Sequence, residues 1–446
     1  MHRLACALPL LGVFLGAPAC SGAEHVAVNE TVHDVLILGA GLAGVSAAAY
    51  LLNNSDLDVM ILEADSMIGG RVHPIKFGSD EVGHVTIERG ANWIQGMSPT
   101  CDPRNPARQN PMWNFQCEYG MKGMYVPGSE QEVRGLHVVF NGTLLTNTSD
   151  KHLAEREDDT MRAYACAERL TESINDTTVS VQDALNKCGW EAKDDIDDVL
   201  QWKVSDSDFA AAASDSSLIL SLPDASYTEF GPDDWLVVDQ NEYGFSKFVH
   251  KIIEPAKAAG KLQLELDTNV TEIDYSHTET IKVVSADGRQ FHAKQVIVTF
   301  SAGVLRHHHR SMFKPSLDPI QSAALEAVPM ANFTKIWLQF PKVWWPDEYK
   351  CVLLADTCGQ DGKIIPWHNL AHPSAIPGSN ALLAIVTGEY AGMLDRLSDS
   401  ELQSVAMERL KCNYPEVPSI VVSFCFLASD FLSCFHIGTL SRCGRL

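Results

Sequence analysis

Two short apolar runs with a helical segment between them stand near the start of the chain. Val35–Leu38 and Val59–Leu62 are continuous apolar segments with the length of buried parallel strands. We expect the segment between them, Val45–Leu52, to form a helix that packs on the sheet. This order of strand, helix and strand predicts an α/β fold in this part of the chain.

The turn between the first strand and the helix is rich in glycine. Gly39, Gly41 and Gly44 form the pattern G-x-G-x-x-G directly after the strand. The first glycine permits a tight turn, the second lets the backbone approach a pyrophosphate, and the third allows close packing of the helix. Leu42 and Ala43 belong to this turn, which leads to the helix N-terminus, where unpaired N–H groups favour negative charge. The turn therefore predicts a dinucleotide site.

An acid and a second glycine pair follow the second strand. Glu63 stands where a carboxylate can accept hydrogen bonds from ribose hydroxyls. A few residues later, Gly70 and Arg71 would bring a guanidinium to the phosphates, which arginine binds in a bidentate manner. Because strand, helix, strand and acid all accompany the glycine turn, we interpret it as a binding site rather than as an ordinary loop.

One later strand carries a lysine in an apolar setting. Lys335 stands in Thr334–Gln339, next to Ile336 and Trp337. Burial lowers the pKa of a lysine and costs free energy unless the ammonium is hydrogen-bonded. The alternative is a surface lysine on an edge strand, with its stem along apolar surface. We predict a chemical role for Lys335.

Several separated motifs, taken in order, resemble the flavin amine oxidase family, and within it the secreted polyamine oxidases. The motifs are Leu38–Gly44, Leu62–Val72, Glu88–Gly96, Asp239–Gly244, Val296–Leu305 and Phe333–Pro341. The resemblance implies FAD as the cofactor, oxygen as the electron acceptor, and the flavin amine oxidase fold. In that fold a Rossmann-like FAD-binding domain is interleaved with an α+β substrate-binding domain.

The domain boundaries follow from this resemblance and from the hydrophobic pattern. We predict a signal peptide at 1–23, an FAD-binding domain at 31–96 and 240–310, a substrate-binding domain at 97–239 and 311–418, and a divergent tail at 419–446. Strand patterns recur in the second FAD segment, and helical patterns occupy parts of the acid-rich insertion.

The resemblance also implies roles for individual residues. It implies cofactor contacts for the Glu88–Gly96 motif and for a backbone group at the adenine end, namely for Gly90, Ala91, Asn92, Trp93 and Val270. The lysine of this family holds a water against the flavin N5, and the sequence match carries that role to Lys335.

The implied substrate is a polyamine such as spermine, spermidine or an acetylated form, oxidised by hydride transfer to the flavin with release of hydrogen peroxide. Relatives carry a glutamate where this chain has Gln95, which can hydrogen-bond an amine but supplies no charge. Asp208 corresponds to a second acid of the relatives, although a solvated loop acid is equally compatible with the sequence. Phe209 and Phe333 would flank the methylenes of the substrate.

The composition limits the possible partners. With 34 basic and 57 acidic residues, the net charge of -23 argues against nucleic acid and anionic membranes. Attraction of a polycation is supported only weakly, since screening acts beyond ~8 Å. No cysteine or histidine spacing predicts a metal site, and we interpret His307–His309 as a solvated loop. The oligomeric state stays open.

The N-terminus resembles a secretory signal peptide. Arg3 precedes the apolar run Leu4–Leu15, which is too short to span a membrane comfortably. Seven N-x-S/T sequons fit passage through a glycosylating pathway; they lie at Asn29, Asn53, Asn141, Asn147, Asn175, Asn269 and Asn332. We expect modification at Asn141 and Asn147 and none at Asn269 and Asn332. The protein is therefore expected to be secreted.

The same oxidising compartment would allow disulfides. Cys101 with Cys117 and Cys351 with Cys358 are close pairs, although spacing does not fix the connectivity.

The C-terminal stretch departs from the family pattern. The resemblance ends near Pro418, and the mostly apolar segment Ser419–Leu446 lacks the glycine-rich motifs that complete the flavin site. We expect a truncated product that folds poorly, exposes an unpaired sheet edge or binds FAD weakly; polar residues in the tail disfavour a membrane anchor. A non-catalytic flavin-binding protein is therefore the alternative to an active polyamine oxidase. An oxidase of another amine is the second alternative.

Overall fold

The computed structural model describes residues 13–16, 31–97, 101, 110–126, 136–222, 230–231, 233–277, 279–346, 349–355 and 366–427. The chain divides into two compact units. The first contains the described residues of Met1–His73 and Ser246–Met330, and the second those of Pro74–Phe245 and Ala331–Asp430.

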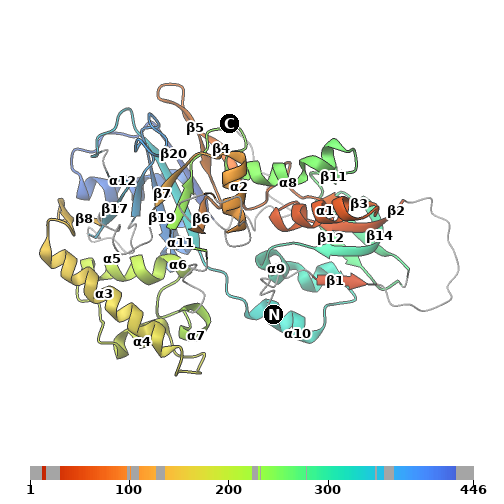
Figure 1. Ribbon diagram of the computed structural model, residues 1–446, viewed down its shortest axis with the longest axis horizontal. Helices are drawn as coiled ribbons and strands as arrows, with labels where there is room; N and C mark the ends of the chain where they lie inside the picture. The colour runs from red at the N-terminus through yellow and green to blue at the C-terminus, as the bar shows by residue number, and fades with distance from the viewer. Residues whose placement is uncertain are drawn as a thin grey trace. The chain divides into compact units, whose positions relative to one another are not determined.

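The first unit is built on an eight-stranded sheet (Figure 1). Its path follows the order β11 (Gln263–Glu265), β3 (Val59–Leu62), β2 (Val32–Leu38), β14 (Gln290–Val298), β13 (Ile281–Ser285), β12 (Val270–Asp274) and β15 (Phe313–Lys314), and β1 (Val13–Gly16) pairs with β14. Strand β2 pairs in parallel with both β3 and β14. The predicted apolar runs therefore form central parallel strands, with Leu36, Leu38 and Leu62 buried in the core.

The helices of the first unit are α1 (Leu42–Asn54), α8 (Lys247–Ala258), α9 (Ala302–Met312) and α10 (Pro319–Ala327). The predicted helix Val45–Leu52 lies inside α1, which buries Val45, Ala48 and Leu52. The expectation of a loop at the three consecutive histidines is wrong, because His307–His309 belongs to α9. His309 is buried there, and its Nδ1 lies 2.9 Å from the Leu305 carbonyl oxygen.

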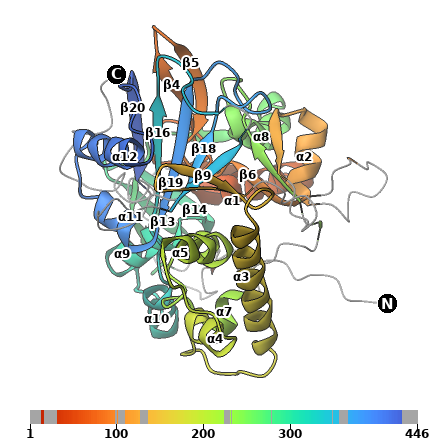
Figure 2. The same ribbon diagram turned by 90° about the vertical axis from the view of Figure 1, so that its left-hand side faces the viewer.

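The second unit contains a seven-stranded sheet, whose strands β16, β18, β19 and β20 are seen together in Figure 2. The order is β20 (Val422–Leu427), β16 (Phe333–Gln339), β19 (Ala381–Thr387), β18 (Pro366–Asn369), β17 (Cys351–Leu354), β8 (His137–Phe140) and β9 (Thr143–Thr146). A three-stranded sheet has the order β6 (Trp93–Met97), β10 (Asp233–Val237) and β7 (Gly123–Val126), and β4 (Pro74–Ser79) pairs with β5 (Gly83–Glu88).

The helices of the second unit are mostly short. They are α2 (Pro111–Tyr119), α3 (Lys151–Leu170), α4 (Val181–Lys187), α5 (Asp195–Gln201), α6 (Ser207–Phe209), α7 (Leu218–Ser221), α11 (Gly388–Leu394) and α12 (Asp399–Asn413). Within the described part of the chain, no helix is both long enough and apolar enough to cross a membrane.

The predicted boundary of the first FAD segment differs from the boundary of the compact unit. Residues 74–96 pack in the second unit. One reason is the side chain of Gln339 on β16, which accepts a hydrogen bond from the Ser79 N–H at 3.0 Å and donates one to the Gly83 carbonyl at 3.0 Å. The β4–β5 hairpin is thereby fixed to the strand that carries Lys335.

Strand β16, which carries Lys335, lies inside its sheet rather than at an edge. Strand β16 pairs with β19 on one side and with β20 on the other. Residues after Pro418 supply β20, in which Phe426 is the backbone partner of Lys335. Both neighbours of β16 are antiparallel, so the backbone of the lysine strand is hydrogen-bonded along both sides.

Two disulfides have both of their cysteines among the described residues. Cys101–Cys117 confirms one of the two pairs considered from spacing, whereas Cys166–Cys188, which joins the end of α4 to α3, was not anticipated. The pairing of Cys351 with Cys358 is wrong, because Cys351 is a free thiol.

Candidate functional site

The glycine turn of the first unit has the geometry that its sequence pattern requires. Gly39 adopts a φ of +107°, a conformation that other residues rarely adopt. A Cβ on Gly44 would lie 1.9 Å from the Gly39 carbonyl oxygen, so close packing of α1 excludes any side chain there. A Cβ on Gly41 would meet no atom within 4 Å. The turn is therefore open where a ligand would approach the backbone.

Helix α1 begins beside this opening without a cap. Its N-cap is Gly41, no side chain caps it, and its first turn, which contains Leu42 and Ala43, carries no acidic residue. The N-terminal N–H groups of a helix have no partner within the helix and carry partial positive charge. An anion such as a diphosphate fits this position.

The second glycine pair lies directly against the first turn. The Gly69 N–H donates to the Ala40 carbonyl at 2.9 Å, and Gly69 forms a parallel bridge with Gly41. A Cβ on Gly70, whose φ is +56°, would lie 3.2 Å from the Gly41 Cα. The exposed Arg71 follows at once. The fold thus brings the two predicted phosphate-binding motifs together.

Glu63 connects the end of β3 to the same turn. Its Oε2 accepts the Ala40 N–H at 2.5 Å, and its Oε1 accepts the Asp65 N–H at 2.9 Å. Burial raises the pKa of Glu63, and these two hydrogen bonds oppose that rise. A carboxylate has about four lone-pair sites, so Glu63 keeps acceptor capacity for a ribose diol.

Sequence reasoning missed a threonine that supports the turn. The Thr299 Oγ1 donates to the Leu38 carbonyl at 2.9 Å and also lies 3.2 Å from the Gly39 carbonyl oxygen. Thr299 follows β14, which pairs with β2. Thr299 lies within the Val296–Leu305 motif. Its position directly after a predicted strand was the sequence signal that could have identified it.

A loop from β11 to β12 runs beside Glu63. The Thr268 N–H donates to the Glu63 carbonyl at 2.7 Å, and the Glu63 N–H donates to the Glu265 carbonyl at 2.8 Å. Two residues after Thr268, the buried Val270 begins β12. The proposed adenine contact at Val270 therefore lies on a segment that is tied to the proposed ribose acid.

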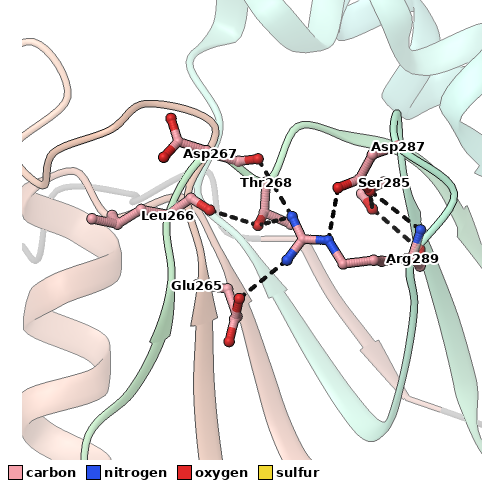
Figure 3. A network of polar contacts seen from close by, with 7 residues as sticks. All are labelled: Glu265, Leu266, Asp267, Thr268, Ser285, Asp287 and Arg289. Carbon is pink, nitrogen blue, oxygen red and sulfur yellow. Dashed lines mark hydrogen bonds and ion pairs between the residues drawn. The ribbon is translucent and has the colours of Figure 1, made fainter.

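Arg289 holds this loop in place (Figure 3). Its guanidinium donates to Glu265 at 3.1 Å, to the Thr268 hydroxyl at 2.8 Å and to Asp287 at 2.8 Å. Figure 3 shows the guanidinium between the β11–β12 loop and the Ser285–Arg289 turn. No motif in the sequence marked Arg289, because Glu265 and Thr268 come from a segment that lies 24 to 21 residues earlier in the chain.

In the second unit, Lys335 is fully enclosed by hydrogen-bond acceptors. It is 3% exposed, and its Nζ donates to the Glu88 carbonyl at 3.2 Å, the Gly90 carbonyl at 2.6 Å and the Asn92 Oδ1 at 3.1 Å. Three acceptors match the three N–H donors of an ammonium. The alternative of a surface lysine on an edge strand is therefore wrong.

Burial lowers the pKa of Lys335 to about 8, and the charge of Glu88 opposes this shift. His368, on β18, lies close enough to feel the lysine charge. Burial and that charge lower the pKa of His368 to about 4, so its imidazole is neutral at pH 7. The His368 ring lies 6.3 Å from the Trp93 ring in an edge-on arrangement. Neither Glu88 nor His368 was among the predicted site residues.

The residues of the predicted flavin-contacting motif differ in their surroundings. Gly90 and Asn92 contact Lys335, Trp93 is half-buried, and Ala91 is exposed. A small pocket of about 20 Å³ lies between Glu88, Asn92 and Asp239. A pocket of this size holds about one water molecule, so it is not the place of a polyamine.

Acidic side chains gather near Gln95. The Gly96 N–H, next to Gln95, donates to Asp234 at 3.1 Å. Burial, followed by the charge of Asp234, raises the pKa of Asp208 to about 6. Asp208 lies in helix α6 rather than in a loop, and its residue surface is exposed although the protein surrounds its carboxyl. Asp234 was missed by the sequence analysis.

The two predicted aromatic residues have different environments. Phe209 packs against the core of the helical region, with Ala163 and Leu185 among its buried members. Phe333 begins β16 and is half-buried. Phe209 therefore packs against other apolar side chains, a role that the prediction of a substrate-flanking ring did not include.

Comparison with known proteins decides the family. Residues 42–440 match the family described as flavin containing amine oxidoreductase. The chain belongs to this family.

The match shows that the oxidase uses FAD and oxidises amines. It also extends past Pro418, which corrects the expectation that family resemblance ends there. Polyamine oxidase 6 of Oryza sativa subsp. japonica is 27% identical over 401 residues, which cover 86% of this chain and 75% of the relative. Polyamine oxidase 1 of Zea mays is 27% identical over 425 residues, which cover 91% and 80%.

A solved structure of wild-type putrescine oxidase bound to putrescine has the same fold. The TM-score is 0.64 at 16% identity, and the alignment covers 89% of this oxidase and 85% of that chain. At this identity the similarity establishes the flavin amine oxidase fold, with its α/β architecture.

The first unit of the oxidase fits the dinucleotide part of FAD. The open position at Gly41 and the uncapped start of α1 suit the diphosphate, and Glu63 suits a ribose. Gly39, Gly44, Gly70 and Arg71 shape and border the same place.

A pair of glycine variants separates the two roles within the turn. We expect Gly44→Ala to destabilise the flavin-free protein by about 1 to 3 kcal/mol, because the new methyl overlaps the Gly39 carbonyl. Gly41→Ala has open space and should leave stability unchanged while lowering FAD affinity. Thermal unfolding and fluorescence titration with FAD measure the two effects. Equal stability of the two variants would contradict the assignment.

A second expectation concerns the Arg289 network. We expect Arg289→Ala to weaken FAD binding by about threefold to tenfold, since exposed ion pairs contribute up to ~1 kcal/mol. Arg310→Ala, which removes an ion pair with Glu326 elsewhere in the same unit, is the control. Titration of the flavin-free protein with FAD measures both. Equal FAD affinities in the two variants would show that the contacts of Arg289 with the β11–β12 loop do not support FAD binding.

Proposed function

We propose that this FAD-dependent amine oxidase acts on polyamines. The observation that carries the proposal is the pair Asp208 and Asp234, the second of which accepts the N–H of Gly96 next to Gln95, in the unit that also contains Lys335. The charge of Asp234 raises the pKa of Asp208, and a cation beside the two carboxylates stabilises their charged forms. A substrate with several ammonium groups supplies such charge, whereas a simple monoamine supplies a single one.

The relatives support the same substrate class. Those from Oryza sativa and Zea mays carry the name polyamine oxidase, and the putrescine oxidase structure contains a diamine. Gln95, next to the residue whose N–H binds Asp234, takes part as a neutral hydrogen-bonding group. Its backbone carbonyl accepts the Asn110 side-chain amide at 2.6 Å, which fixes the strand that carries it.

FAD, when bound, accepts a hydride from the carbon next to the reacting nitrogen and is reoxidised by oxygen, which yields hydrogen peroxide. The resulting imine hydrolyses to an aldehyde and a shorter amine. The protein's part is to bind the distal ammonium groups at the acids and so orient the reacting C–H bond.

We further propose that Lys335 serves the reaction through its proton. As an ammonium it donates to Glu88, Gly90 and Asn92 at once. As a neutral amine it has two N–H donors and one lone pair, so one contact is released and the nitrogen can hold a water molecule. With a pKa of about 8, both forms are accessible near neutral pH.

Anaerobic addition of amine to the flavin-loaded protein tests the proposal. We expect spermine, spermidine or N-acetylspermine to bleach the visible flavin bands, and benzylamine to leave them unchanged at the same concentration. Bleaching by benzylamine alone would identify an oxidase of another amine class. Flavin bands that no amine bleaches would indicate a non-catalytic flavoprotein.

We also propose that the protein passes through the secretory pathway. The signal-like N-terminus and the disulfides Cys101–Cys117 and Cys166–Cys188 support this proposal. Among the sequons in the described residues, Asn53, Asn141, Asn175 and Asn332 are exposed. Asn147 is less suited than its sequence context suggested, because its amide donates to Glu157 at 2.8 Å.

Glycan removal checks this placement. We expect peptide N-glycosidase treatment of the secreted protein to lower its mass, and the combined variant Asn141→Gln and Asn175→Gln to lose most of that difference. A protein that enters the medium without a mass change would show that these sequons are unoccupied.

A further inference from the structure

Glu88 contacts the lysine site with its backbone and buries its carboxyl beside it. The residue ends β5 and is 6% exposed. Its carbonyl accepts the Lys335 Nζ at 3.2 Å. Its Oε1 accepts the Phe245 N–H at 2.6 Å, whereas its Oε2 is buried with no hydrogen-bond partner among the described residues. A carboxylate in this setting is costly unless a positive charge lies near.

The neighbouring turn is shaped around this carboxyl. Gly244 adopts a φ of +45°, and a Cβ on it would lie 2.1 Å from the Glu88 Oε1. The absence of a side chain at Gly244 therefore leaves room for the Glu88 carboxyl. The N–H of the next residue, Phe245, donates a hydrogen bond to it. This contact comes from a residue 157 positions later in the chain.

Three titratable groups face the Glu88 carboxyl or the lysine. Burial, which is the largest influence, and repulsion by Asp239 raise the pKa of Glu88 to about 7, while the Phe245 hydrogen bond and the charge of Lys335 oppose this rise. His368 is neutral at this pH. Both Asp239 oxygens already accept backbone N–H groups, from Asn241 at 3.1 Å and Lys122 at 3.2 Å. Lys335 is therefore the cation that compensates Glu88.

The pocket next to Glu88 is too small for an amine substrate, so the Glu88 carboxyl does not contact the substrate through this pocket. Its volume of about 20 Å³ admits about one water molecule. Asn92 lines the same pocket and accepts a hydrogen bond from Lys335. Glu88 thus acts on the lysine through charge and through the β5–β6 segment.

We propose that Glu88 is a positioning residue that keeps Lys335 protonated and therefore bound to all three of its acceptors. Loss of the carboxylate charge favours the neutral amine, which has two N–H donors for three acceptors. The consequence for catalysis rests on the proposed function of Lys335. The coupling between the two side chains is a property of the folded chain itself.

The test compares Glu88→Gln with Asp239→Asn. Glutamine keeps an oxygen for the Phe245 N–H and removes only the charge. In the flavin-loaded enzyme, we expect Glu88→Gln to move the lysine-dependent limb of the pH profile for anaerobic flavin reduction, near pH 8 in the wild type, down by about one pH unit or more. Asp239→Asn removes a charge that repels Glu88, so we expect this limb to stay or to move up.

A second readout uses the flavin-free protein and needs no activity. Because the pKa of Lys335 is lowered from 10.5 to about 8, folding stability rises with pH between these values. In Glu88→Gln this rise should begin at a lower pH, and in Lys335→Met it should vanish. A rise that begins at the same pH in the wild type and in Glu88→Gln overturns the proposal.

If Glu88→Gln does not fold, the same coupling can be measured through the pKa of Glu88. The pKa of Glu88 is raised from 4.5 to about 7, so stability falls as pH rises through this window. Lys335→Met should extend that fall to higher pH, since coupling is mutual. An unchanged window overturns the proposal. If the stability shifts occur but no amine reduces the flavin, the coupling stands and the proposed function fails.

Discussion

Lys335→Met is expected to slow amine-dependent flavin reduction by about 100-fold to 1,000-fold, the range typical of a lost proton-transfer or positioning group. Methionine fills similar space but leaves the Glu88 and Gly90 carbonyls and the Asn92 side chain without their donor. Stopped-flow absorbance with spermine under anaerobic conditions measures the rate directly.

The pH dependence should change together with the rate. In the wild type, the rate should respond to pH near the lysine pKa of about 8. In Lys335→Met, that response should be absent. The exposed Lys342, which follows β16, provides the control variant Lys342→Met. A Lys335→Met enzyme with full FAD content and a rate within twofold of the wild type would falsify the proposed role.

The second large effect is expected at the acids. Asp208→Asn combined with Asp234→Asn should raise the KM for spermine by about 10-fold to 100-fold, since hydrogen bonds to charged groups contribute about 1.5 to 3 kcal/mol. We expect a smaller change in kcat, because these groups bind the distal ammonium ions in the ground state and in the transition state alike.

The same site should respond to acid. Asp208 has a pKa of about 6, so it loses its charge as pH falls through that value, and the KM for spermine should then rise. Peroxide release at several spermine concentrations, from pH 5 to 8, measures this change. Asp80→Asn removes a fully exposed acid of the same unit and serves as the control. Equal KM values for spermine in the control and in the double variant would show that Asp208 and Asp234 do not bind the substrate.

Much of the cofactor site was predictable because its determinants are local. The strand, glycine turn, helix, strand and acid lie between Val32 and Glu63, and each requires a particular residue type at a particular position. The observed β2, α1 and β3 follow these predictions closely. A short segment with one dominant conformation leaves little for distant residues to decide.

The sequence by itself therefore determined the dinucleotide turn, the family and the apolar setting of Lys335. The tertiary structure decided which groups surround the lysine, since its three acceptors lie 243 to 247 positions earlier in the chain. It also decided that Asp234 joins Asp208, that Arg289 clamps the loop beside Glu63, and that β20 covers β16. Hydrogen bonds and charge pairs between distant segments depend on how the strands pack, and no local pattern of residues encodes that packing.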